Sequence, residues 1–104
     1  MSSPQDLGPT DAVVAVDVQR DFCPGGALAV TEGDLVVEPL NRWMEAAAGA
    51  GAMVIASRDW HPADHVSFAE RGGPWPEHCV RGTEGAELHP ALVLRFRGEI
   101  LQKP

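Results

Sequence analysis

The stretch RDWHPADHVSF, residues 58–68, places Asp59, His61 and His65 within seven positions. A carboxylate with two imidazoles suits Zn, Mn or Fe(II) and leaves coordination positions open for a further ligand, water or substrate. His78 is the natural third imidazole, because the long loop that follows could fold it back. The alternative is a solvent-exposed loop whose histidines cap turns. The spacing favours a divalent metal site over that alternative.

Two further charged residues end apolar runs of the chain, Asp17 in the first run and Lys103 in the last. A partly buried Asp17 could serve as a general base, although a strand-end Asp can also cap a turn or pair with Arg20. Lys103 is an ordinary solvated lysine unless its strand lies beside the first strand. In that arrangement it would approach Asp17 and could stabilise charge that develops on a substrate.

Aromatic and thiol side chains lie close to these polar residues in the sequence. Phe22, Trp60 and Trp75 could wall a pocket for a flat ring, or they could simply pack within loops. Cys79 follows a histidine directly, but no neighbouring feature clearly lowers its pKa, so we interpret it as a small buried thiol. With only Cys23 besides it, no disulfide framework is expected.

The elements that must position these residues follow from the apolar pattern. Residues 12–18 and 52–57 are short, β-branched apolar runs typical of strands buried on both faces. Between them a helix is predicted, with Asp34 as its N-cap and Gly49 and Gly51 at its end. Its apolar residues recur at helical spacing: Val36, Leu40, Trp43, Met44 and Ala47.

The order strand, helix, strand predicts a βαβ unit with a parallel sheet and a right-handed crossover, and residues 98–103 read as a third strand. Residues 58–90 form an unusually long irregular segment. Because ligands of open parallel sheets bind beyond the carboxyl ends of the strands, the charged residues at those ends are expected to converge there. Three strands and one helix leave sheet faces uncovered, so the chain is expected to be part of a larger α/β design.

Length and composition narrow the function classes. The chain has 104 residues, 44% of them hydrophobic, which fits one small globular domain, and residues 1–11 read as a flexible leader before a partial domain at 12–104. A net charge of −7 argues against nucleic-acid and anionic-membrane partners. No export signal and no apolar stretch of about 20 residues is found, so a cytoplasmic location is expected.

Four ordered motifs resemble the N-terminal part of bacterial nicotinamidases (pyrazinamidases), which belong to the isochorismatase-like hydrolase superfamily. They are VAVDVQRDFCPGGALAV, SRDWHPADHVSF, GGPWPEHCVRGTEGAELHP and ILQK. The resemblance runs from about residue 12 to residue 104. It implies a three-layer α/β fold with helices on both faces of a parallel sheet. It also implies hydrolysis of a small aromatic amide, nicotinamide, to nicotinate and ammonia.

The resemblance also implies roles for individual residues. Asp17 and Lys103 would be two members of an Asp–Lys–Cys triad, and Phe22 and Trp75 would flank the substrate ring. The implied ligands of a divalent metal (Zn, Mn or Fe) are Asp59, His61, His65 and His78.

The family's nucleophilic cysteine comes after the triad lysine, and neither cysteine of this chain sits in a matching motif. We therefore expect the isolated chain to be inactive. A non-catalytic metal-binding remnant and a different hydrolase of the superfamily are the alternatives, and a homo-oligomer is one open option for its assembly.

Overall fold

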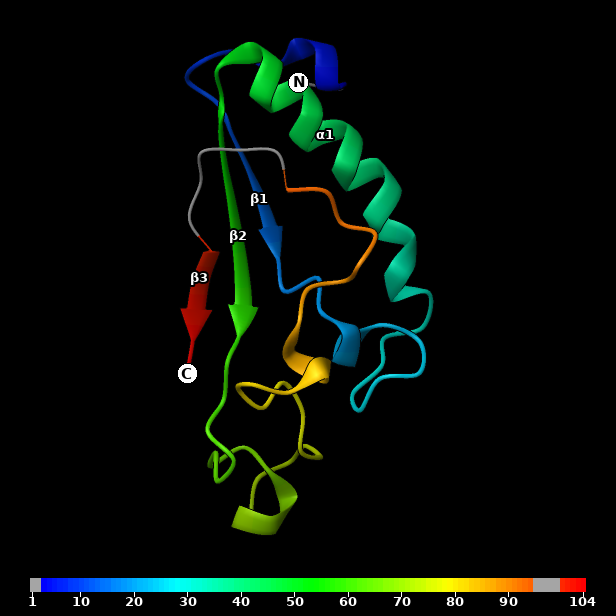
Figure 1. The fold of residues 1–104 in the computed structure, drawn as a ribbon, viewed down its shortest axis with the longest axis vertical. Helices are drawn as coiled ribbons and strands as arrows, with labels where there is room; N and C mark the ends of the chain where they lie inside the picture. Colours follow the sequence, from blue (N-terminus) through cyan, green and yellow to red (C-terminus); the bar gives the residue numbers. More distant parts are fainter. Residues whose placement is uncertain (1–2, 95–99) are drawn as a thin grey trace.

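A single parallel sheet organises the molecule. The computed structural model describes residues 3–94 and 100–104. Strands β1 (Ala12–Val16), β2 (Met53–Asp59) and β3 (Ile100–Lys103) pair in the order β1-β2-β3, with α1 (Val37–Ala50) between β1 and β2 in the sequence (Figure 1). This arrangement confirms the predicted α/β class and the parallel pairing. Of the third predicted strand, residues 98 and 99 lie outside the described residues.

The central strand β2 is longer than predicted, and β1 is shorter. β3 pairs with β2 as far as Asp59, which extends β2 two residues past the predicted end at residue 57. β1 stops at Val16, because the next residue, Asp17, has a φ of 53°. That left-handed conformation cannot continue a strand. β2 therefore continues to Asp59, past Ser57, which pairs with the last residue of β1. We call this difference the offset between β1 and β2.

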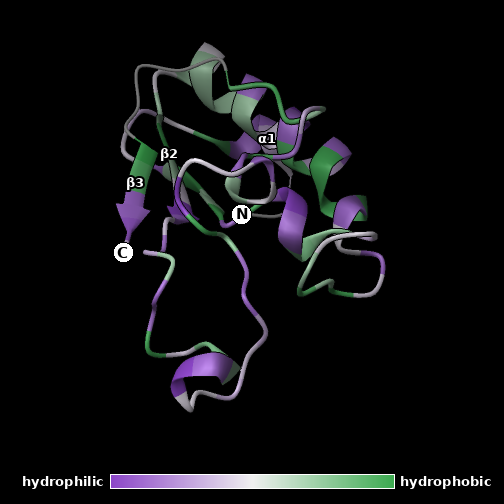
Figure 2. Ribbon diagram, turned by 60° about the horizontal axis from the view of Figure 1, so that its bottom comes forward, coloured by the Kyte–Doolittle hydropathy of each residue, from purple (hydrophilic) through white to green (hydrophobic). Residues whose placement is uncertain are grey.

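Helix α1 packs on one face of the sheet and forms the core with it. The core is a cluster of side chains that are at most 1% exposed: Ala15, Met44, Ala47, Val54 and Ala56. On β1, however, Val14 and Val16 are 53% and 62% exposed. The prediction that the first strand is buried on both faces is wrong within the described residues, because α1 covers only one of them. Figure 2 shows apolar and polar residues alternating along α1, and β3 changing from apolar to polar toward its end.

The start of the helix differs from the prediction, and its end agrees with the prediction at Gly51 but not at Gly49. Asp34 lies in a 3-10 helix, η3 (Gly33–Val36), and the residue that precedes α1 is Val36, which makes no side-chain cap hydrogen bond. The N-cap prediction is therefore wrong. Gly51 ends α1 in the left-handed conformation, at a φ of 73°, as expected for a helix C-terminus. Gly49 lies inside the helix rather than after it.

The segments outside the strands and α1 contain short 3-10 helices. Their bounds are η1 (Pro4–Asp6), η2 (Arg20–Phe22), η4 (Ala69–Arg71) and η5 (Glu84–Ala86). In the N-terminal segment Leu7 packs against the core, while the division into a leader and a domain stays a prediction. The described ranges include no helix that is both long and apolar enough for a membrane crossing.

Candidate functional site

Charged side chains from all three strands meet at the carboxyl edge of the sheet. Nζ of Lys103, the last residue of β3, lies 2.7 Å from Oδ2 of Asp17 and 3.3 Å from Oδ1 of Asp59. The expectation that this contact requires β3 beside β1 is wrong. β3 instead pairs with β2, where Lys103 is in register with Asp59. The lysine side chain therefore spans the end of β2 to contact Asp17.

Both carboxylate oxygens of Asp17 accept hydrogen bonds. Oγ of Ser57 donates to Oδ1 at 2.8 Å, and Lys103 donates to Oδ2. The alternative partner, Arg20, is 3.2 Å from Glu84 instead. The hydrogen bond with Asp17 is the main cause that raises the pKa of Lys103, so the lysine is held in its charged form. We refer to these two residues as the Asp17–Lys103 pair.

A possible metal site lies directly beside this pair. Asp59, His61 and His78 each offer a ligand atom, and these atoms all lie within 4.8 Å of one another. We call these three residues the candidate metal group. Backbone hydrogen bonds within the loop bring these distant residues together. The N–H of His61 donates to the carbonyl oxygen of Cys79 at 2.9 Å, and the N–H of Arg81 donates to the carbonyl oxygen of His61 at 2.8 Å.

The two histidines of the candidate metal group are buried and suited to bind a cation. Nδ1 of His78 is 2.7 Å from the carbonyl oxygen of Pro76 and must donate to it, which leaves the lone pair on Nε2. Burial, followed by the neighbouring His65, lowers the pKa of His61 and favours the neutral ring that metals require. Nδ1 of His61 is buried without a hydrogen-bond partner among the described residues. One carboxylate and two imidazoles fit a divalent transition metal.

His65 stands apart from this group. Its ring stacks on that of His61, with 4.0 Å between the centroids. Nδ1 lies 2.7 Å from Oγ of Ser67 and 3.2 Å from its backbone nitrogen. A neutral ring that donates from Nδ1 to the hydroxyl keeps a lone pair on Nε2 for a metal, whereas a ring that accepts at Nδ1 carries its proton on Nε2. Its role as a fourth ligand stays a prediction.

The aromatic residues around the group are only partly those singled out from the sequence. Phe22 lies 5.7 Å from His78 between ring centroids. Trp75 is 49% exposed, and in the described part of the chain it makes no ring contact with Phe22 or the histidines. Their placement around a substrate ring stays a prediction. Phe68, which the sequence analysis missed, is buried against the rings of all three loop histidines; its one signal was an apolar residue in a polar loop.

Both cysteines are buried free thiols, which confirms the interpretation of Cys79. Burial, together with nearby carboxylates led by Asp21, raises the pKa of Cys79 to about 12. Burial, followed by Asp34, also raises the pKa of Cys23. Thiols with raised pKa values are poor nucleophiles at neutral pH, because little thiolate is present.

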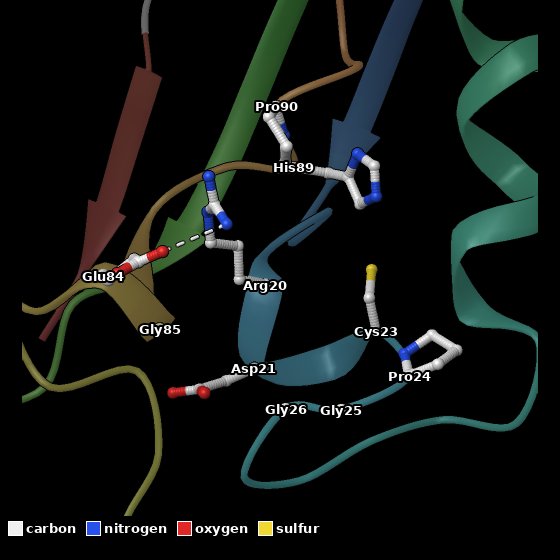
Figure 3. A pocket seen from close by; sticks show the side chains of 10 residues that line it. All are labelled: Arg20, Asp21, Cys23, Pro24, Gly25, Gly26, Glu84, Gly85, His89 and Pro90. Atoms are coloured by element: carbon white, nitrogen blue, oxygen red, sulfur yellow. Dashed lines mark ion pairs between the residues drawn. The ribbon is translucent and has the colours of Figure 1, made fainter.

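A hollow of about 360 Å³ lies beside the candidate site rather than over it. Arg20 and Glu84, joined by their ion pair, line it together with Cys23 and His89, which approach from different segments (Figure 3). No residue of the candidate metal group and neither member of the Asp17–Lys103 pair lines it. The hollow and the candidate metal group are therefore separate features of this structure.

The structure is a parallel βαβ sheet whose carboxyl edge carries acidic and histidine side chains. The Isochorismatase domain family matches residues 11–104, and the chain is a member of that family. This family membership and the three parallel strands with one long helix confirm the isochorismatase-like fold, of which this chain covers about half.

Several proteins similar to this chain are described as nicotinamidases or pyrazinamidases. The nicotinamidase of Escherichia coli (strain K12) is 48% identical over 110 residues, which cover 91% of this chain and 52% of the relative. The crystal structure of the pyrazinamidase of Pyrococcus horikoshii in complex with zinc has a TM-score of 0.86 at 48% identity, over 91% of this chain and 52% of that one. The crystal structure of PnC1 from L. infantum in complex with nicotinate has a TM-score of 0.78 at 37% identity, over 90% of this chain and 47% of that one. The chain thus spans about half the length of the relatives that it matches.

Proposed function

We propose that this chain carries the metal-binding and acid–base part of a nicotinamidase-type amide hydrolase, which converts nicotinamide and water to nicotinate and ammonia. The observation that carries the proposal is the meeting of the Asp17–Lys103 pair and the candidate metal group at one sheet edge. The similarity to proteins described as nicotinamidases and to a structure in complex with nicotinate supports the same substrate class.

The proposed reaction is covalent. A cysteine thiolate forms a bond with the carboxamide carbon, the C–N bond breaks with release of ammonia, and water hydrolyses the thioester to nicotinate. Asp17 takes the thiol proton and gives it to the departing nitrogen, which leaves as ammonia. In the second half of the reaction it takes a proton from the attacking water and returns it to the cysteine sulfur as the thioester breaks, while Lys103 keeps its charge beside the reacting centre. A divalent metal held by the candidate metal group would supply an electron-pair acceptor for the ring nitrogen of the substrate.

Neither cysteine of this chain meets the requirements of the nucleophile. Cys79 is fully buried with a pKa of about 12, and Cys23 is buried among the loop residues that follow η2. We therefore propose that the 104-residue chain alone releases no ammonia from nicotinamide. An ammonia assay on the purified chain tests this proposal. Turnover above the buffer rate that disappears in Asp17→Ala would overturn it.

The metal site has its own test, a zinc titration followed by thermal unfolding. A ligand at about 100 times its Kd stabilises the folded state by about 2.7 kcal/mol, which corresponds to a rise in Tm of about 10–20 °C for a domain of this size. We expect this rise in the wild type and its loss in His61→Ala and in His78→Ala. His89→Ala is the matched control, because this histidine lies at the hollow outside the group. An equal rise in His61→Ala and the wild type contradicts the ligand assignment.

Two finer points remain part of the proposal. The zinc titration of His65→Ala decides whether His65 is a fourth ligand, and the same titration with Mn²⁺ or Fe²⁺ addresses which metal is preferred. Another hydrolase of the family is the alternative function, and a panel of aromatic amides assayed on a chain that includes the nucleophile separates the two. The cytoplasm is the proposed compartment, with which two free thiols are compatible.

A further inference from the structure

Gln19 is a fully buried polar residue to which the proposed reaction assigns no role. Its exposed fraction is 0%, and it follows β1 at the carboxyl edge of the sheet. Nε2 donates to the carbonyl oxygens of Asp59 and Ala86, at 2.8 Å each, and Oε1 accepts the N–H of Asp59 at 2.9 Å. The amide thus holds both backbone groups of one residue, and that residue belongs to the candidate metal group.

These bonds replace a section of the sheet that the backbone of β1 does not provide. If the parallel pairing of Val16 with Ser57 continued, the N–H of Asp59 would donate to the carbonyl of Asp17. The next bond would run from the N–H of Gln19 to the carbonyl of Asp59. Asp17 turns away at a φ of 53°, and its carbonyl accepts the N–H of Gln19 at 2.9 Å instead. The side chain of Gln19 supplies the acceptor and the donor that this turn removes.

The offset between β1 and β2 therefore depends on one side-chain amide. β2 continues past the end of β1 (Figure 1), and its backbone there must be hydrogen-bonded, because buried amide groups without partners destabilise the folded state. The same offset lets Asp17 turn toward Lys103 while Asp59 faces both Lys103 and His61, the latter with 3.4 Å between Oδ2 and Nε2.

We propose that Gln19 is a positioning residue for the candidate metal group. Its amide fixes the backbone of Asp59 and thereby aims the carboxylate at His61. This inference rests on the proposed function, because it takes Asp59 as a metal ligand. Gln19→Met keeps the shape of the side chain but leaves the N–H and the carbonyl of Asp59 and the carbonyl of Ala86 without their partner. Groups that orient metal ligands in this way typically contribute about 10–100-fold to metal affinity.

Asn41 offers a matched control elsewhere in the fold. Its side-chain amide also bridges two backbone groups, donating to the carbonyl of Ala91 at 2.9 Å and accepting the N–H of Val93 at 2.8 Å. It extends from α1 and bonds no residue of the candidate metal group. Asn41→Leu therefore removes the same kind of contact without disturbing Asp59.

The experiment is a Co²⁺ titration of the purified chain, followed by the visible absorption of the bound ion below the unfolding temperature of every variant. We expect Gln19→Met to bind Co²⁺ about 10–100-fold more weakly and with an altered spectrum. Asn41→Leu should retain both the affinity and the spectrum of the wild type, even if it loses comparable thermal stability.

Wild-type affinity and spectrum in Gln19→Met overturn the inference while leaving the metal site intact. No Co²⁺ binding by the wild type overturns the metal site itself, and the inference with it. If Gln19→Met does not fold, Gln19→Glu takes its place, since it keeps an acceptor for the N–H of Asp59 and loses both donated bonds. Wild-type Co²⁺ binding in that variant also overturns the inference.

Discussion

Replacing Lys103 by Met removes the only cation that the structure places between Asp17 and Asp59 in the described part of the chain. The ammonium lies 2.7 Å from one carboxylate and 3.3 Å from the other, and the two carboxylates are about 20% and 18% exposed. A hydrogen bond to a charged group contributes about 1.5–3 kcal/mol. Because the lysine side chain is 48% exposed, solvent screening reduces this value. We expect a loss of roughly 1–2 kcal/mol in the free energy of unfolding.

For a domain of about 100 residues, this loss corresponds to a fall in Tm of about 4–16 °C. The Asp17 hydrogen bond raises the pKa of Lys103 in the folded state above its ordinary value of 10.5. The contribution to stability is therefore fully present below pH 10.5 and is lost as the pH rises through the folded pKa. The difference in Tm between the wild type and Lys103→Met should be constant near neutral pH and should shrink in strongly alkaline buffer.

Thermal unfolding followed by circular dichroism measures both effects. Lys103→Arg keeps the charge and should retain most of the stability, and Arg42→Met controls for loss of an exposed cation on α1. A Tm for Lys103→Met within about 1 °C of the wild type at neutral pH refutes the reasoning, because it leaves less than about 0.3 kcal/mol for the contact. A difference that persists unchanged far above the lysine pKa refutes the assignment to the ammonium.

Two further predictions concern the loop segments around the site. Gly73→Ala places a Cβ against the backbone of Ser67, so the loop must shift and Tm should fall by several degrees. Gly49→Ala, in open space on α1, should raise the free energy of unfolding by about 0.5–1 kcal/mol. Equal effects of the two substitutions on Tm would contradict this account. The raised pKa values of Cys79 and Cys23 predict alkylation by iodoacetamide at neutral pH that is far slower in the folded protein than in the urea-unfolded chain. Mass spectrometry that finds rapid modification of Cys79 under native conditions rules out its burial as a thiol.

The parallel sheet and the meeting of charged residues at its edge were predictable, because both follow from the order of apolar runs. The first strand ends in a charged residue, and strands of a parallel sheet end on the same side. The strand neighbours were not predictable in the same way: the contact of Lys103 with Asp17 needs only that one side chain spans β2, whereas the sequence analysis required adjacent strands.

The residues that support the site were missed for a related reason. Gln19 and Ser57 are uncharged, and their roles depend on a φ of 53° at Asp17 and on the uneven ends of two strands. Neither feature can be predicted from the spacing of residue types in the sequence. The loop histidines could be predicted as metal ligands because imidazole is a common ligand. The contacts of His65 with Ser67 could not be predicted, because they depend on the local conformation of the loop.

The left-handed backbone of Asp17 bears on which substitutions position 17 can tolerate. Among residues with a side chain, Asp and Asn adopt such a φ most readily, while β-branched residues do so rarely. Gly and Asn therefore suit this backbone conformation as well as Asp does, and of these three only Asp also gives Lys103 a carboxylate. Glu adopts a similar φ elsewhere in this chain, at Glu32, but at position 17 its additional methylene group would displace the carboxylate from its contacts with Ser57 and Lys103. Backbone conformation and charge pairing, which are independent requirements, together favour Asp at position 17.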